Sequence, residues 1–373
     1  MRARALIDTG AVERNCRRLA AELGDGTALC AVVKADAYGH GVIRCGRAAL
    51  AGGAGWLAVA AASEAVDLRR ELGAQPPVLV LGALTPDELG LALAADADIA
   101  VWRRGFLELV EARARELELP PPRVHVKIDT GMGRLGESDP AAVAELARAV
   151  AASPDVELAG IWTHFATADD PDDGFMAQQL ARFRELAEPL RDELGGPLLH
   201  AANSAATLRE PAAHFDLVRC GVAIYGLDPF GRDPVEQRLE PALELRSYVA
   251  DIKRFEAGMS AGYGRTWRAT EPTSVGILPI GYGDGVRRGL SNNCEVLVDG
   301  HRYPLVGTVS MDNITIDLGP EPRVQAGAEA VLIGKQGGER ILAEELARRL
   351  ATINYEITCG ISSRVPRELP GAR

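Results

Sequence analysis

Lys34 directly follows the apolar run Ala31-Val32-Val33 in this chain of 373 residues. A single lysine at such a position is most often a solvated charge at the edge of a sheet. A lysine partly withdrawn from water has a lowered pKa instead, and it can form a Schiff base with a carbonyl cofactor. Lys34 is therefore a candidate attachment site if other chemistry converges on it.

Polar residues follow several other apolar runs, namely Lys127 with Arg134, His164, Asn203 with Ser204, and Arg219. In a (β/α)8 barrel the carboxyl ends of the strands meet at one face and carry the chemistry. The backbone N–H groups of Gly221 and Val222, with Ser204 at the expected start of a helix, would form a phosphate cradle. A Schiff-base lysine facing a phosphate cradle favours pyridoxal phosphate (PLP) as the cofactor.

The spacing of apolar residues predicts the elements that must position these groups. Buried parallel strands are expected at 28–34, 56–60, 77–81, 98–102, 123–129, 157–164, 197–201 and 216–219. Segments with helical periodicity are expected at 11–23, 62–73, 104–117, 139–152 and 175–194. About eight strand–helix units over this length predict an α/β fold, a (β/α)8 TIM-type barrel rather than an open sheet.

After about residue 240 the pattern changes to short strands joined by turns. Strands are expected at 244–252, 275–280, 295–298, 302–306, 313–318 and 329–334, with one helix over 339–351. We therefore expect two domains, a barrel over residues 1–240 and a C-terminal β-rich domain over residues 241–373.

Composition limits the expected partners and location. The 41 Lys and Arg against 52 Asp and Glu leave a net charge of −11, and no basic run offers a nucleic-acid or membrane patch. No apolar stretch is long enough for a membrane span or a signal peptide, so we expect a cytoplasmic protein. The six cysteines form no CxxC pair and the six histidines no HExxH motif, so we expect no metal site.

Residues 131–136 match the GxGxxG pattern of dinucleotide-binding turns. An isolated match of this kind is weak. Asp129 would also bring a negative charge toward a pyrophosphate. We therefore expect no dinucleotide site here.

Residues 31–41, AVVKADAYGHG, resemble the PLP-attachment signature of bacterial alanine racemases. Other segments agree with that family in order along the chain, at 127–136, 200–205, 219–222, 261–264, 281–285, 310–312, 353–356 and 364–367. The resemblance covers nearly the whole chain. It implies a homodimer of two-domain subunits that interconverts L-alanine and D-alanine and supplies D-alanine for peptidoglycan.

The resemblance also implies roles for individual residues. Lys34 would hold PLP as an internal aldimine and act as one base, and Tyr263 of the partner subunit would act on the opposite face of the external aldimine. The cofactor would be held by Lys34, Tyr38, His164, Asn203, Ser204, Arg219, Gly221, Val222 and Tyr282. The substrate would contact Arg134, Tyr355 and, from the partner subunit, Met311.

General chemistry agrees with these roles. Racemisation removes a proton on one face of a carbon and returns it on the other, so two bases are needed. Lysine and tyrosine both have ordinary pKa values of about 10, so both need tuning by their surroundings. Arg219 can only donate a hydrogen bond to the pyridine nitrogen, whereas an acid there would protonate the ring and favour transamination and decarboxylation.

Lys127 and Arg134 would be like charges close together, which is unfavourable without a neighbouring anion. In many relatives the matching lysine is carbamylated, so we expect a carbamate on Lys127; an unmodified Lys127–Asp129 contact is the alternative. Thr308 stands where the family often has arginine, which implies a different entry channel near Asp169. His40 and His200 are interpreted as structural histidines.

Four alternative functions fit the sequence less well. A basic-amino-acid decarboxylase on the same plan would carry an acid in place of Arg219. A broad-specificity racemase would need a roomier pocket than Tyr355 and Lys127 indicate. A non-catalytic PLP carrier would leave the second domain and Tyr263 unexplained. A metal hydrolase would need a cluster of ligands that the sequence lacks.

Overall fold

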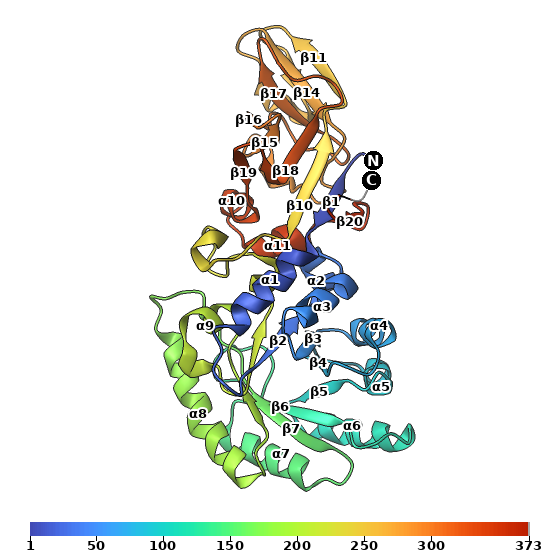
Figure 1. The fold of residues 1–373 in the computed structure, drawn as a ribbon, viewed down its shortest axis with the longest axis vertical. Helices are drawn as coiled ribbons and strands as arrows, with labels where there is room; N and C mark the ends of the chain where they lie inside the picture. The colour runs from blue at the N-terminus through green and yellow to red at the C-terminus, as the bar shows by residue number, and fades with distance from the viewer. Residues whose placement is uncertain (372–373) are drawn as a thin grey trace. The chain divides into compact units, whose positions relative to one another are not determined.

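The computed structural model describes residues 1–371, which form two compact units. One unit comprises residues 12–224, and the other comprises residues 1–11 together with the chain from residue 225 onward. The first strand of the chain belongs to the sheet of the second unit (Figure 1). The domain boundary expected at residue 240 stays a prediction.

The first unit is a nearly closed barrel of eight parallel strands. Their bounds are β2 (Ala28–Val32), β3 (Trp56–Val59), β4 (Val78–Val80), β5 (Asp98–Val101), β6 (Arg123–Lys127), β7 (Glu157–Trp162), β8 (Leu198–His200) and β9 (Leu217–Cys220). β2 pairs with both β3 and β9, which brings the first and last strands of the series together. The predicted barrel is confirmed.

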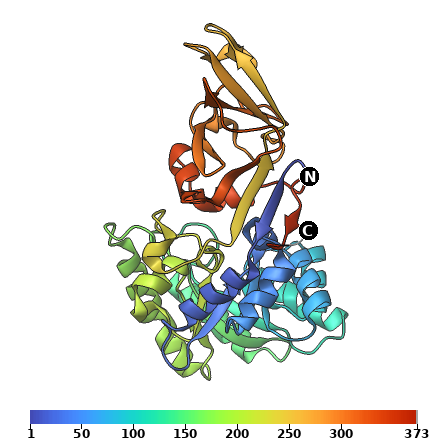
Figure 2. The ribbon, with the colours of Figure 1, turned by 45° about the horizontal axis from the view of Figure 1, so that its top comes forward.

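Helices surround the barrel strands (Figure 2). Their bounds are α1 (Thr9–Ala20), α2 (Lys34–Gly39), α3 (Val42–Ala51), α4 (Ala62–Leu72), α5 (Pro86–Ala94), α6 (Arg104–Glu116), α7 (Pro140–Ala152), α8 (Phe175–Glu193) and α9 (Ser204–Arg209). The helix expected to begin at Ser204 is α9, whereas α2, α3 and α5 were not predicted. For α5 the signal was present in the sequence, because Thr85 and Glu88 form a capping box and Pro86 begins the helix.

The second unit is rich in β-structure. Its main sheet has the order β16–β15–β18–β10–β1–β20, with β19 paired to β18. These strands are β1 (Arg4–Ile7), β10 (Leu243–Tyr248), β15 (Glu295–Val298), β16 (His301–Pro304), β18 (Glu329–Gln336), β19 (Glu339–Ile341) and β20 (Arg367–Glu368). A second sheet contains β11 (Asp251–Phe255), β14 (Thr273–Leu278) and β17 (Ile314–Gly319), and a separate hairpin contains β12 (Ser260–Ala261) and β13 (Trp267–Arg268).

The helix expected over 339–351 begins later than predicted. Its first residues form β19, which pairs with β18 through Gly334 and Ile341, and the helix α10 spans only Ala343–Arg349. A further helix, α11 (Asn354–Cys359), was not predicted. Pairing across a hairpin therefore outweighs helix propensity at residues 339–341.

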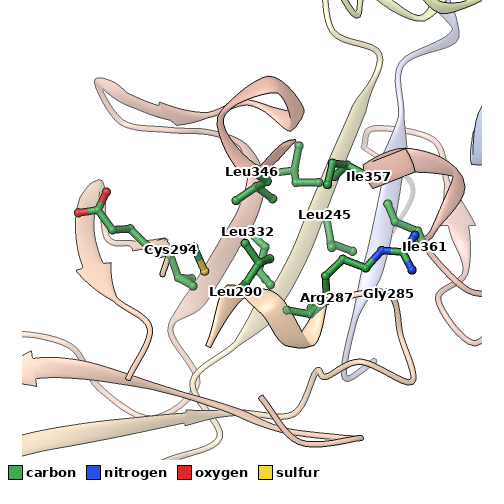
Figure 3. Close-up of a pocket in the computed structure, with 13 residues that line it drawn as sticks. Leu245, Gly285, Arg287, Leu290, Cys294, Leu332, Leu346, Ile357 and Ile361 are labelled. Carbon is green, nitrogen blue, oxygen red and sulfur yellow. The ribbon is translucent and has the colours of Figure 1, made fainter. Parts of the chain in front are cut away.

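Apolar side chains from β10, β18, α10 and α11 enclose a small cavity in the second unit (Figure 3). Its volume is about 20 Å³, and Leu245, Leu332 and Ile357 are among its lining residues. That volume is close to what one water molecule requires. The cavity is therefore a packing defect of the core and too small for a substrate.

Within residues 1–371, no helix has both the length and the apolar character needed to cross a bilayer.

Candidate active site

The carboxyl ends of the barrel strands bring together most of the barrel residues that the sequence analysis selected. Lys34 lies two residues beyond β2, Lys127 ends β6, and His164 lies two residues beyond β7. Asn203 caps α9 after β8, where its side-chain oxygen accepts from the N–H of Ala206. Arg219 lies within β9.

The segment after Lys34 has an unusual backbone. Residues 35–38 have φ between 51° and 55° and ψ between 36° and 50°, which makes α2 a left-handed turn. Left-handed residues other than glycine cost roughly 1–2 kcal/mol each, and runs of them are rare. Two carboxylates support the turn: Glu64 accepts from the N–H of Ala35 at 2.5 Å, and Asp36 accepts from the N–H of Val42 at 2.8 Å. Such strain is characteristic of segments that hold a functional group in place.

Arg219 is buried and held on several sides. One terminal nitrogen donates to the carbonyl oxygens of Thr163 and Ala201, at 2.7 and 3.0 Å, and lies 3.4 Å from Nδ1 of His164. The guanidinium also lies over the ring of Trp162. Burial lowers the pKa of Arg219 to about 10, so the group stays protonated at neutral pH.

A chain of hydrogen bonds runs from Arg219 through the barrel interior. Nη1 of Arg219 lies 2.9 Å from Nδ1 of His200, Nε2 of His200 lies 3.0 Å from Nδ1 of His125, and Nε2 of His125 lies 2.9 Å from Asp98. Arg123 donates to the same carboxylate through two nitrogens.

The chemistry of the donors determines the direction of this chain. Arginine only donates, so Nδ1 of His200 accepts and its proton is on Nε2. That proton points to Nδ1 of His125, so His125 carries its own proton on Nε2 and donates it to Asp98. The expectation that His200 is structural thus becomes more specific, because it links Arg219 to a buried carboxylate.

Positive groups dominate the barrel mouth. Burial lowers the pKa of His164 well below its ordinary value, and the charges of Arg219, Lys127, Arg134 and Lys34 lower it further. Burial likewise lowers the pKa of Lys127 to about 7, with Arg219 and Arg134 adding to the effect. Such a site favours an anionic ligand, and it favours an uncharged amine at Lys127.

Asp129 does not neutralise Lys127 through a direct contact. Its carboxylate accepts from the N–H groups of Gly131, Met132 and Gly133, at 2.9, 2.7 and 3.1 Å. Among the ion pairs of residues 1–371, none joins Asp129 to Lys127. The same contacts fill the GxGxxG turn with the chain's own carboxylate, which leaves no place there for a pyrophosphate.

Tyr38, Ser204 and Gly221 form a small polar cluster. The N–H groups of Gly221 and Ala223 point to Oγ of Ser204, at 3.0 and 3.4 Å. A Cβ on Gly221 would lie 2.3 Å from the hydroxyl of Tyr38, so a side chain there would displace that hydroxyl. Hydroxyl and amide donors packed around a glycine suit a phosphate ester, so these residues fit the phosphate of PLP.

The remaining predicted residues lie in the second unit. The side chains of Tyr263, Tyr282 and Met311 are exposed there, and Tyr355 is half-buried. The loops of Tyr282 and Met311 are adjacent, because the N–H of Tyr282 donates to Ser310 and that of Gly283 to Met311, both at 2.9 Å.

Ion pairs hold these two loops together. Asp284 is fully buried and pairs with Arg2 and Arg364. Arg364 and Arg2 also pair with Asp312, at 2.6 and 3.4 Å, so both arginines join the loop of Tyr282 to that of Met311. No role was predicted for these charged residues, although all but Arg2 lie in segments that resemble the family.

Asp98, the first residue of β5, and His125, in the middle of β6, were not predicted as part of the site. A buried ionisable residue in a strand is itself a signal, since such groups are rarely buried without a partner. Within residues 1–371, no group of three or more His, Cys, Asp or Glu could hold a metal ion.

Fold and site together define a barrel enzyme whose cationic mouth suits small anionic molecules, joined to a sheet-rich second domain. Two family models match the chain, the alanine racemase N-terminal domain over residues 7–229 and the alanine racemase C-terminal domain over residues 242–369. The chain belongs to the alanine racemase family, whose members are isomerases.

Individual relatives agree with this assignment. The chain is 42% identical over 364 residues to the alanine racemase of Symbiobacterium thermophilum, covering 97% of this chain and 96% of that protein. It is also 42% identical to the alanine racemase of Geobacillus stearothermophilus, covering 97% and 92%. The crystal structure of alanine racemase from a D-cycloserine-producing Streptomyces lavendulae matches with a TM-score of 0.93 and 38% identity, covering 100% of this chain and 98% of that chain.

Proposed function

We propose that this chain racemises alanine with PLP, that it works as a cytoplasmic homodimer, and that it supplies D-alanine for peptidoglycan. The observation that carries the proposal is the barrel mouth. The charges of Lys34, Lys127, Arg134 and Arg219 all lower the pKa of His164 there, and Tyr38, Ser204 and Gly221 form a polar cluster in the same barrel. A site of this charge fits a molecule with both a phosphate and a carboxylate.

PLP supplies an electron sink that makes the α-proton of an amino acid removable. Lys34 would hold the cofactor covalently, and its amine would take or return the proton on one face. Tyr38, Ser204 and the amide of Gly221 would bind the phosphate, with Asn203 and Val222 beside them and Tyr282 contributing a hydroxyl.

Arg219 would donate to the pyridine nitrogen without giving up its proton. Its pKa of about 10 and its contacts with Thr163, Ala201 and His200 support that role, since they hold the charged donor in place. His164, whose pKa is lowered by burial and by its cationic neighbours, would stay neutral and would not compete for the same anions. This arrangement favours rapid return of the proton over side reactions.

The phenol of Tyr263 would be the second base, acting on the opposite face of the substrate. Its side chain is 74% exposed in the single subunit, as expected for a group that completes the site of a partner. Met311 and Tyr355 would contact the substrate beside it, and Arg134 would bind the substrate carboxylate from the barrel side.

Lys127 would carry a carbamate. Its lowered pKa leaves a large fraction of neutral amine at neutral pH, which is the form that reacts with carbon dioxide. The carboxylate of Asp129 accepts hydrogen bonds from the N–H groups of residues 131–133. Among the described contacts no other anion lies close to Lys127 and Arg134, and a carbamate would supply one.

The direct test is proton NMR of the purified holoenzyme with L-alanine in D2O, combined with chiral analysis. We expect loss of the α-proton signal together with a drift toward equal amounts of the two enantiomers. Exchange with full retention would exclude Tyr263 as the second base. No exchange in a protein that carries PLP would contradict the proposed activity and favour the carrier or another amino acid.

A further inference from the structure

Tyr263 lies in a turn with little support of its own. The turn joins β12 to β13, and Gly262, Gly264 and Arg265 have φ of 70°, 71° and 51°. Its backbone hydrogen bond, from the N–H of Arg265 to Gly262, is 3.4 Å long. The Arg265 side chain also donates to Ser260, at 2.8 Å. Positive φ is unfavourable for arginine, so contacts from outside the turn must stabilise it.

The hydroxyl of Thr308 provides such a contact. It donates to the backbone carbonyl of Tyr263 at 2.8 Å and lies 3.2 Å from the hydroxyl of Thr266 at the far end of the turn. A threonine hydroxyl has one proton, so Thr266 must donate to Thr308. Asn292 in turn donates to Thr266 at 3.1 Å. The relay therefore runs in one direction, from Asn292 to the carbonyl of Tyr263.

The segment that carries Thr308 is pressed against the turn. A Cβ on Gly262 would lie 3.0 Å from the amide nitrogen of Thr308, and a Cβ on Gly307 would lie 2.6 Å from the carbonyl oxygen of Ala261. Asn292 also accepts from the N–H of Gly307 at 2.6 Å. Within residues 1–371, the backbone–backbone hydrogen bonds do not join residues 260–265 to residues 306–310, so side-chain hydroxyls make the polar connection.

We propose that Thr308 is a positioning residue for Tyr263, and that its hydroxyl, ordered by Thr266 and Asn292, determines where the phenol is presented. The inference rests on the proposed function, in which Tyr263 is the second base. A hollow of about 360 Å³, lined by Gly262, Tyr263, Thr308 and Ser310, adjoins the turn and gives it room to move when the hydroxyl is removed.

The first experiment needs neither cofactor nor activity. Amide hydrogen exchange at residues 262–266 is compared in the apoprotein for the wild type, Thr308→Val and Thr308→Ser. Valine keeps the shape and loses the hydroxyl, so we expect exchange in the turn to rise on the order of tenfold. Serine keeps the hydroxyl and should restore the wild-type rate.

Thr27→Val is the matched control. The hydroxyl of Thr27 donates to the carbonyl of Phe215 at 2.6 Å in the barrel unit. This variant therefore loses the same kind of hydrogen bond at a position remote in sequence from residues 262–266. It should leave exchange at residues 262–266 unchanged. Exchange in the turn that is unaffected by Thr308→Val would overturn the proposal.

The second experiment measures primary deuterium isotope effects with each α-deuterated enantiomer of alanine. A misplaced Tyr263 slows proton transfer on one face only. We expect Thr308→Val to lower kcat about tenfold with little change in KM. The isotope effect should rise for one enantiomer and fall for the other, and Thr308→Ser should restore both values. A merely structural defect would lower kcat and leave both isotope effects at their wild-type values, which would contradict a positioning role.

The two proposals fail in different ways. If the wild type does not racemise alanine, the proposed function fails, while hydrogen exchange still tests the relay. If the wild type racemises and Tyr263→Phe is inactive, unchanged isotope effects in Thr308→Val overturn the inference alone. If Thr308→Val does not fold, hydrogen exchange and the isotope effects are measured with Thr266→Val instead. Smaller changes in the same direction support the relay, and no change overturns it.

Discussion

Buried polar side chains define the chemistry of the barrel mouth. Arg219 touches two carbonyl oxygens and one histidine, and that histidine leads through a second one to Asp98. Each hydrogen bond in this chain has a single permitted direction. Arg219 as donor and Asp98 as acceptor, at the two ends of the chain, therefore favour the same tautomer of both imidazoles.

The variant Asp98→Asn tests this chain. Loss of the carboxylate leaves Arg123 without its ion-pair partner and weakens the hydrogen bond that His125 donates, so we expect a loss of roughly 1–3 kcal/mol in the free energy of unfolding. Nitrogen-15 NMR of the histidines in the apoprotein should show a changed Nε2 signal for His125, while Arg219 keeps His200 protonated on Nε2. Asp96→Asn is the control, because the side chain of Asp96 is 91% exposed. Imidazole spectra identical to those of the wild type would refute the chain.

Lys127 carries the second prediction at this scale. With its pKa at about 7, the neutral amine that forms a carbamate is present above that pH and is lost below it. Carbon-13 NMR in labelled bicarbonate should therefore show a carbamate signal that disappears as the pH falls through about 7. Lys127→Met should abolish the signal. The control variant Lys253→Met, at an exposed lysine, should leave the signal unchanged. A signal that is absent at every pH would exclude the modification.

Single elements determine how these side chains are presented. The left-handed turn α2 begins at Lys34, and four consecutive residues other than glycine hold the strained conformation. Glu64 and Asp36 stabilise it through backbone N–H groups on either side. Rigid presentation of Lys34 thus comes at a cost in stability, which the rest of the barrel must offset.

Ala35→Gly should relieve part of this cost. Glycine adopts positive φ without a steric penalty, so we expect an unchanged or higher Tm together with a lower kcat, because the turn becomes more flexible. Ala112→Gly in the middle of α6 provides the contrast, with an expected loss of about 0.5–1 kcal/mol and unchanged kcat. Thermal unfolding and steady-state kinetics measure both variants. A marked fall in Tm for Ala35→Gly would contradict the presence of strain.

At the scale of the whole molecule, the candidate residues fall into two groups on two compact units. Lys34, Arg219 and the phosphate cluster belong to the barrel, whereas Tyr263, Tyr282 and Met311 belong to the sheet-rich unit. Strand β1 joins the chain's first residues to that second unit, by pairing with β10 and β20.

A mixed dimer tests whether one site needs both subunits. One chain carries Tyr263→Phe and the other Lys34→Ala, and each homodimer should be inactive. In the hybrid, one site keeps both bases, so about half the wild-type activity per dimer is expected if the two sites are independent. The two chains are tagged separately, and the hybrid is purified on both tags before assay. A completely inactive hybrid would exclude a second base supplied by the partner subunit.

Several features followed from the sequence alone. Eight apolar runs, each short and separated by helical segments, predicted the barrel because parallel strands are buried on both faces. The positions of Lys34, Lys127, His164 and Arg219 after or within these runs predicted that they would converge, since strand ends of a barrel meet at one face. Local pattern is sufficient for such features.

Other features required the tertiary structure. Pairing of β1 with β10 joins residues more than 200 positions apart, and nothing in the local pattern of Arg4–Ile7 indicates that partner. The same holds for the chain from Arg219 to Asp98 and for the relay from Asn292 to Tyr263, each built from single polar residues on separate segments. Hydrogen-bond partners are chosen by distances of about 3 Å in the folded chain, and sequence spacing carries no record of those distances.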